Sequence, residues 1–206
     1  MSVNAELQHP APEIAWTGGV SPFGTSWSKL MMWLFIVTDA LIFAGFLGSY
    51  GFLRLAAGAW PDRSRMFHLD FIALMTFTLI TSSATMATAV AAAKMNHGRR
   101  VRQFVWLTVV GGTAFLGMQA YEWSTLIGQG ASLSSNPWGP ALFGASFFLI
   151  TGFHGTHVLS GVIVLAIVAI RSSMGIASAD GVEIAGLYWH FVDLVWVFIF
   201  TFFYLI

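Results

Sequence analysis

Two pairs of side chains that can bind protons or metal ions lie within long apolar stretches of the sequence. His154 and His157 form one pair, and His190 and Asp193 form the other. Residues three apart share one face of an α-helix, so each pair presents its polar groups in one direction. If the two faces met, three imidazoles and one carboxylate would suit zinc, iron or manganese. We favour hydrogen bonds or ion pairs between neighbouring helices, because no Glu-x-x-His pattern or second acidic ligand completes a di-metal set.

Asp39 is a third ionisable group inside an apolar stretch. It follows Leu30 by nine residues, which is about 14 Å along a helix and therefore near the middle of a bilayer. An ionised carboxylate that faced lipid there would cost about 3 kcal/mol or more. We therefore expect Asp39 to be protonated, paired or directed towards a polar cavity. Its role is either a hydrogen-bonded helix contact, or proton handling, or the ordering of a lipid or partner subunit.

Four further polar residues fall near the ends of apolar stretches. Gln119 and Glu122 are three apart in the third stretch, where a carboxyl near the membrane surface can stay hydrated. Arg171 ends the fourth stretch, and it can reach the interface, complement the helix dipole or hold a lipid phosphate. Glu183 precedes the fifth stretch, where its charge favours the N-terminal end of a helix.

The composition indicates which elements must hold these groups. Of the 206 residues, 57% are hydrophobic and only 9% are charged, whereas soluble domains carry about 25% charged residues. Five apolar stretches approach or exceed the roughly 20 residues that span a bilayer, and they cover residues 30–53, 71–93, 104–127, 141–170 and 184–206. The sequence predicts an all-α, polytopic membrane bundle over residues 29–206, with five transmembrane helices joined by short connections, after a polar tail over residues 1–28.

The polar tail and the basic residues predict the orientation. Glu6 and Glu13 stand where a secretory signal would have basic residues and an apolar core, so we do not expect a cleavable signal peptide. Six basic residues fall on the side of the N-terminus and three on the opposite side. The six are Lys29, Lys94, Arg99, Arg100, Arg102 and Arg171, and the three are Arg54, Arg63 and Arg65. The positive-inside rule therefore predicts an N-terminus inside and a C-terminus outside.

Charge and cysteine content exclude several functions. Nine Lys and Arg residues balance nine Asp and Glu residues, so no basic field exists that could bind the phosphates of nucleic acid. The chain has no cysteine, which excludes disulfides, thiolate metal sites and iron–sulfur clusters. The short connections also leave no room for a catalytic domain outside the membrane.

Two motifs resemble the signature helices of a known family. Residues 151–158 read TGFHGTHV and residues 188–196 read YWHFVDLVW. Together and in this order they resemble subunit III of the haem–copper respiratory oxidases. The resemblance continues through QAYEW at residues 119–123 and TDALIFAGF at residues 38–46, and so covers nearly everything after the tail. The chain looks like the shorter bacterial form, which lacks the first two of seven helices.

The resemblance implies a role without a redox centre in this chain. Haem and copper would belong to subunits I and II of a proton-pumping cytochrome c oxidase in the bacterial inner membrane. This subunit would pack on subunit I, contact subunit II and other respiratory subunits, bind phospholipid in the cleft between the first two helices and the remaining bundle, and support proton uptake and active-site stability. Asp39 matches the family's buried acid, and Arg171 matches an arginine at a lipid head group. The polar residues that match the signature helices are His154, His157, Glu183, His190 and Asp193.

Four alternatives remain open at this point. Many cytochrome c oxidase relatives carry Ser-Glu where this chain has Thr38-Asp39, and quinol oxidases can carry Asp there, so the electron donor is undecided. An accessory subunit of a nitric oxide reductase is a second reading within the family. A small proton-coupled transporter would instead use Asp39 and the histidine pairs as a relay. A metal-dependent membrane enzyme would bind a stoichiometric ion.

Overall fold

The computed structural model describes residues 24–62 and 66–205, and these form five long helices without strands. The helices are α1 (Trp27–Ala56), α2 (Leu69–Lys94), α3 (Gly98–Gly128), α4 (Ala141–Ser173) and α5 (Ala179–Phe200), and a short π-helical turn, η3 (Thr201–Leu205), follows α5. Each of the five is long and apolar enough to cross a membrane, which confirms the predicted class. Most of the predicted tail, residues 1–23, lies outside the described residues, as do Arg63 and Arg65.

The helices extend beyond the apolar stretches that predicted them. Helix α3 begins at Gly98 rather than at residue 104, because the arginines of its first turns are good helix formers that can lie at a membrane surface. Helix α5 begins five residues before the predicted start. The Ser178 side chain caps this end by accepting a hydrogen bond from the Gly181 backbone N–H at 3.1 Å. Hydropathy thus locates the membrane core, whereas caps and helix propensity determine the ends.

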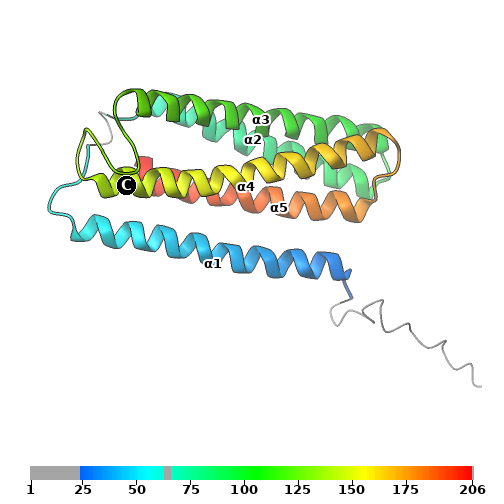
Figure 1. Ribbon diagram of the computed structural model, residues 1–206. Helices are drawn as coiled ribbons and strands as arrows, with labels where there is room; N and C mark the ends of the chain where they lie inside the picture. Colours follow the sequence, from blue (N-terminus) through cyan, green and yellow to red (C-terminus); the bar gives the residue numbers. More distant parts are fainter. Residues whose placement is uncertain (1–23, 63–65, 206) are drawn as a thin grey trace, which may run out of the picture.

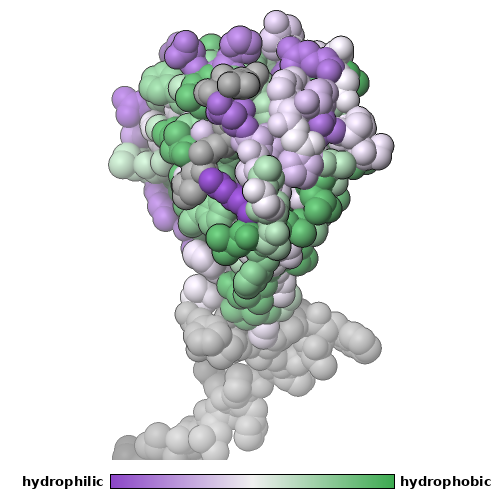
Figure 2. Space-filling view, turned by 90° about the vertical axis from the view of Figure 1, so that its left-hand side faces the viewer, coloured by the Kyte–Doolittle hydropathy of each residue, from purple (hydrophilic) through white to green (hydrophobic). Residues whose placement is uncertain are grey.

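Helices α2 to α5 form a bundle, and α1 lies along one side of it (Figure 1). Helix α5 occupies the central position, since it packs against α1, α2 and α4. Figure 2 shows the end of the molecule where α1 connects to α2 and α3 connects to α4. Hydrophilic residues gather over the bundle at this end. The lower part, which α1 forms, is mostly hydrophobic. Helix α1 packs less extensively on the rest of the chain than the other four helices do, and mainly against α4 and α5.

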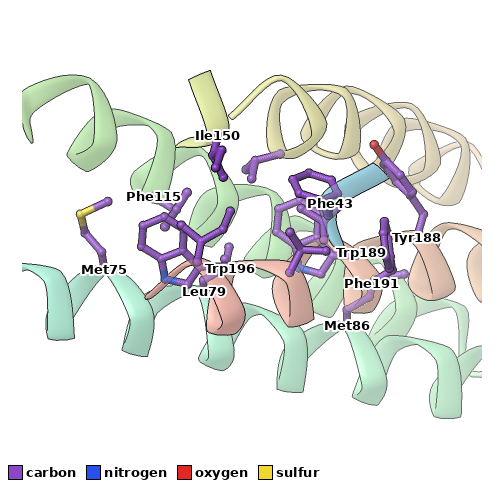
Figure 3. Close-up of a cluster of buried hydrophobic side chains, with 14 of the residues drawn as sticks. Phe43, Met75, Leu79, Met86, Phe115, Ile150, Tyr188, Trp189, Phe191 and Trp196 are labelled. Carbon is purple, nitrogen blue, oxygen red and sulfur yellow. The ribbon is translucent and has the colours of Figure 1, made fainter. Parts of the chain in front are cut away.

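Trp189 of α5 lies at the centre of the bundle, fully buried (Figure 3). Its ring occupies notches in two neighbouring helices, because a Cβ atom built on Gly112 of α3 would lie 2.4 Å from Trp189 Cη2, and one on Gly161 of α4 would lie 2.9 Å from Cε3. The indole Nε1–H donates to Ser82 Oγ of α2 at 3.1 Å. One side chain therefore joins four helices, and glycine is required where its ring meets them.

Helix α1 is fixed to the bundle near both of its ends. Near its N-terminal end, Lys29 Nζ lies 2.8 Å from Glu183 Oε1 of α5, which also lies 3.2 Å from Lys94 Nζ of α2. Towards its C-terminal end, the buried Tyr50 ring packs at 4.1 Å, centroid to centroid, on Phe203 of η3. Glu183 thus has a structural role beyond the helix dipole, since it links three helices.

Candidate functional site

Asp39 is buried between α1 and α4, where it meets His157. Only 5% of Asp39 is exposed, and its Oδ2 lies 3.3 Å from His157 Nε2. His157 Nδ1 lies 2.8 Å from the Phe153 carbonyl oxygen. That carbonyl can only accept, so Nδ1 carries a proton, which leaves Nε2 and the Asp39 carboxyl to hold one further proton or none. With one further proton, the pair is either a protonated carboxyl beside a neutral imidazole or a carboxylate beside an imidazolium.

Aromatic rings enclose this pair. Phe43 meets the His157 ring edge-on at 5.4 Å, and Phe153 packs on it at 4.6 Å. Interactions between charges and dipoles are stronger in such an environment than in water, and an unpaired polar group is correspondingly more costly. The alignment of Oδ2 departs from that of a full hydrogen bond, although Oδ2 lies 3.3 Å from His157 Nε2. The surroundings therefore favour a carboxyl that is neutral or paired over a lone carboxylate.

An apolar groove of about 560 Å³ opens beside the pair, between α1 and α5. Small residues of α1 form one wall, including Ala44, Gly48 and Gly51, and Phe191 and Phe198 of α5 form the other. Helix α1 is held near its two ends, so the small residues between them leave this space unfilled. A groove with almost no polar lining suits a hydrocarbon chain and excludes a charged ligand.

His154 does not share the direction of His157, although both belong to one motif. Its ring is fully buried and stacks on Trp196 at 5.4 Å, with Phe115 edge-on at 5.9 Å. Neither ring nitrogen has a hydrogen-bond partner among the described residues. His154 points into the bundle whereas His157 points to α1, so the first pair does not act as a unit.

The second pair is directed towards α2. Ser83 Oγ lies 2.6 Å from His190 Nδ1, and the same hydroxyl contacts the Asp193 carboxyl. The spacing had suggested that the two motif pairs face each other, but His157 contacts Asp39 and His190 contacts Ser83 instead. The sequence interpretation missed Ser83, although adjacent serines at 82 and 83 in the middle of an apolar stretch were a usable signal.

Glu122 is buried, which corrects the expectation that it stays hydrated at a helix end. It is 7% exposed, and Tyr204 donates its hydroxyl to the two carboxyl oxygens at 3.0 and 3.1 Å. The terminal turn η3 folds over this part of α3, which the sequence pattern did not indicate. Gln119, one turn earlier, donates from Nε2 to the Thr151 carbonyl of α4 at 2.9 Å. Both residues hold helices together.

Arg171 is exposed in the last turn of α4, beside the first turn of α5. A pocket of about 200 Å³ lies there, and its lining includes Arg171, Val164, Ser178 and Gly181. The guanidinium favours an anion, because it presents N–H donors and a positive charge. Within residues 24–62 and 66–205, no three His, Cys, Asp or Glu side chains lie together as metal ligands.

Comparison with known proteins supplies the family. The family model for cytochrome c oxidase subunit III matches residues 12–206 of the chain. The chain belongs to this family. Cytochrome c oxidase subunit 3 of Alkalihalophilus pseudofirmus is 38% identical over 182 residues, which cover 85% of each protein, and the subunit 3 of Thermostichus vulcanus is 34% identical over 177 residues, which cover 84% of each.

The relatives of this subunit III include both oxidase classes. Cytochrome bo(3) ubiquinol oxidase subunit 3 of Pseudomonas putida is 34% identical over 184 residues, which cover 86% of the chain and 84% of that protein. The chain is thus a subunit III of a haem–copper oxidase, and its five apolar helices agree with a membrane protein. The family assignment therefore takes the place of the two other interpretations of the buried polar residues, a proton-coupled transporter and a metal-dependent enzyme.

Proposed function

We propose that this subunit III packs on subunit I of the oxidase, binds a phospholipid, and sustains proton uptake through Asp39. The observation that carries the proposal is the Asp39–His157 contact, a buried carboxyl and imidazole at 3.3 Å within helices that cross the membrane. A carboxyl near the membrane centre is costly unless it is neutral or paired. In this proposal the Asp39–His157 pair holds one proton next to an apolar groove, and it accepts or releases that proton while α1 stays in place.

The proposal for the lipid rests on two features of different chemistry. The groove between α1 and α5 is almost wholly apolar and accommodates an acyl chain. Arg171 borders a separate pocket of about 200 Å³, where its guanidinium can bind a phosphate. We infer that an anionic phospholipid places its head group at Arg171 with its chains in the membrane.

The proposal also covers the surroundings of the subunit. Haem and copper belong to subunits I and II, and the complex lies in the bacterial inner membrane with the N-terminus of this chain on the cytoplasmic side. Cytochrome c is the proposed donor, because most of the similar proteins named above are cytochrome c oxidase subunits. Quinol is the second candidate, supported by the Pseudomonas putida relative. Oxidation assays of the assembled complex with each donor in turn decide between them.

Replacing Asp39 by Asn tests the proton role. The amide can still donate a hydrogen bond to His157 Nε2, but it cannot exchange a proton, so the fold should persist while sustained turnover weakens. We expect an unchanged haem spectrum of the complex and an active lifetime shortened by up to about tenfold, the effect of roughly 1.4 kcal/mol on a rate. Oxygen consumption followed over many turnovers measures this lifetime.

Asp70→Asn is the matched control for Asp39→Asn. Asp70 is an exposed carboxyl in the first turn of α2, so its replacement should leave the lifetime unaltered. Equal lifetimes for the two variants and the unmodified complex would exclude a proton role for Asp39. Loss of the haem signals with Asp39→Asn would instead indicate that the carboxyl acts in assembly.

Replacing Arg171 by Ala tests the lipid site. Removal of the guanidinium eliminates the charge-assisted hydrogen bonds to a phosphate, so the purified complex should retain about one phospholipid fewer. Phosphorus analysis and mass spectrometry of the extracted lipids measure the change. Arg99→Ala is the control, because Arg99 is also an exposed arginine, in the first turn of α3, outside this pocket. An unchanged lipid count with Arg171→Ala would contradict the assignment.

A further inference from the structure

Arg54, in the last turn of α1, carries a positive charge that no acidic side chain of the described residues neutralises in an ion pair. Lys29, the basic residue near the other end of α1, is paired with Glu183 at 2.8 Å. Arg54 follows Leu30, where the apolar stretch begins, by 24 residues. This is about 36 Å along a helix, just beyond the roughly 30 Å of hydrocarbon. The Arg54 guanidinium is therefore available at the level of the lipid phosphates.

Arg54 stands at one end of the apolar groove between α1 and α5. Leu47 and Gly51 line the groove and precede Arg54 by seven and three residues, so the three share one face of α1. Side chains of a helix lean towards its N-terminus, and that of Arg54 therefore leans towards the Gly51 end of the groove. A positive charge thus borders a groove with almost no polar lining. The combination suits a ligand with an anionic group at one end and a hydrocarbon chain at the other.

The groove is long enough for an extended hydrocarbon chain. Its α1 wall runs from Ile36 to Gly51, a separation of fifteen residues or about 22 Å. One leaflet of a bilayer is about 15 Å deep. Beyond the Ile36 end, the ring of Phe35 packs on that of Tyr188 at 5.9 Å between centroids, so α1 and α5 meet there. A chain that starts at the Gly51 end, next to Arg54, can therefore lie along the groove without a bend.

Arg54 and Arg171 lie at opposite membrane surfaces. Arg54 is close to the connection between α1 and α2, and Arg171 is close to the connection between α4 and α5. These two connections are at opposite ends of the molecule (Figure 1). The pocket at Arg171 and the groove also share no lining residue. Because a phospholipid has its head group at one surface only, the two arginines would bind two different lipid molecules.

We propose that Arg54 and the groove between α1 and α5 form a second phospholipid site, which takes an anionic lipid from the leaflet opposite Arg171. The guanidinium binds the phosphate of this lipid, and one acyl chain lies in the groove along α1 from Gly51 towards Ile36. The chain occupies the space that the small residues of α1 leave unfilled, and it adds contacts between α1 and α5. The inference rests on the proposed lipid binding, and it gives the second lipid its own residues and its own leaflet.

The first test removes the charge of Arg54. With Arg54→Gln, the purified complex should retain about one anionic phospholipid fewer, whereas Arg54→Lys, which keeps the charge, should retain it. Phosphorus analysis and mass spectrometry of the extracted lipids measure both. The losses caused by Arg54→Gln and Arg171→Ala should add in the combined variant, because they concern different molecules.

The outcomes of this test separate the two lipid sites. An unchanged lipid count with Arg54→Gln overturns the second site, and so does a combined variant that loses no more than Arg171→Ala alone. A loss with Arg54→Gln but none with Arg171→Ala supports the second site and contradicts the lipid site of the proposed function.

The second test fills the groove and leaves Arg54 in place. Gly48 lines the groove, and a Cβ atom there meets no atom within 4 Å, so Gly48→Leu places its side chain in the groove without a backbone clash. Gly45→Leu is the matched control, because Gly45 is on the same helix and equally unobstructed but does not line the groove.

The probe for these variants is photoactivatable phosphatidylglycerol in phosphatidylcholine vesicles that contain the intact complex. Labelling of residues 36–51 and 191–202 should fall by about tenfold with Gly48→Leu, which corresponds to about 1.4 kcal/mol, and should persist with Gly45→Leu. Equal labelling of the two variants overturns the proposal. Equal labelling by photoactivatable phosphatidylcholine, or cross-links from the groove to another subunit in place of lipid, also overturns it.

Discussion

Replacement of Trp189 by Ala is expected to lower the free energy of unfolding by about 3–5 kcal/mol, the range for large aromatic residues in protein cores. The ring is fully buried and packs against Gly112 and Gly161. These glycines have no side chains that could fill the cavity left when the Trp189 ring is removed. The variant also leaves Ser82 Oγ without the indole donor at 3.1 Å. Loss of this side chain removes a contact from α2, α3 and α4 at once.

Thermal unfolding in detergent, followed by circular dichroism, measures the effect of Trp189→Ala. Trp33→Ala is the control, because Trp33 of α1 is 48% exposed and faces away from the bundle. We expect a large fall in the unfolding midpoint for Trp189→Ala and almost none for Trp33→Ala. Similar shifts for both would show that the bundle does not depend on the central ring.

Gly112→Val should prevent α3 from packing and reduce the folded chain in the membrane severalfold. A Cβ at residue 112 would lie 2.4 Å from Trp189 Cη2 and 2.7 Å from Val162 Cγ2, so no rotamer of valine fits. Overpacking of a core typically costs about 1–3 kcal/mol, and here two further helices would have to move. The folded fraction, measured after extraction into mild detergent, reports the loss.

Gly117→Val separates the clash from the helix propensity of valine. Gly117 is on the same helix, and a Cβ there meets no atom within 4 Å, so this variant should accumulate normally. Combining Gly112→Ala with Trp189→Phe provides a further check. The smaller ring makes room for the methyl group, so the combined loss should be less than the sum of the two. Additive losses would contradict direct contact between residues 112 and 189.

The five helices could be predicted because the length of each apolar stretch alone shows that it can span a membrane. The membrane requires about 20 apolar residues in a row, and this local requirement is visible without any tertiary contact. The helix ends were less accurate for the same reason. Gly98 begins α3 inside a basic segment, and Ser178 caps α5 before the apolar stretch that starts at residue 184.

The pairing of the polar residues could be predicted only in part. Spacing correctly placed His190 and Asp193 in one cluster, but it could not reveal that Ser83 of another helix joins them. Spacing also grouped His154 with His157, but the two rings point to different helices. His154 stacks on Trp196 of α5, whereas His157 contacts Asp39 of α1. Contacts between distant parts of the chain depend on helix rotation, which a periodic pattern leaves undefined.

The attachment of α1 has a consequence for biosynthesis. Helix α1 is made first, yet it packs mainly on α4 and α5, which are made last. Asp39 therefore enters the bilayer before the ribosome has produced His157. Glu183, the partner of Lys29, is synthesised later still. In that interval a proton on the Asp39 carboxyl is the means of neutralising it within this chain. The newly made helix must be held by the insertion machinery or by a neighbouring protein until the last hairpin arrives and closes the bundle around it.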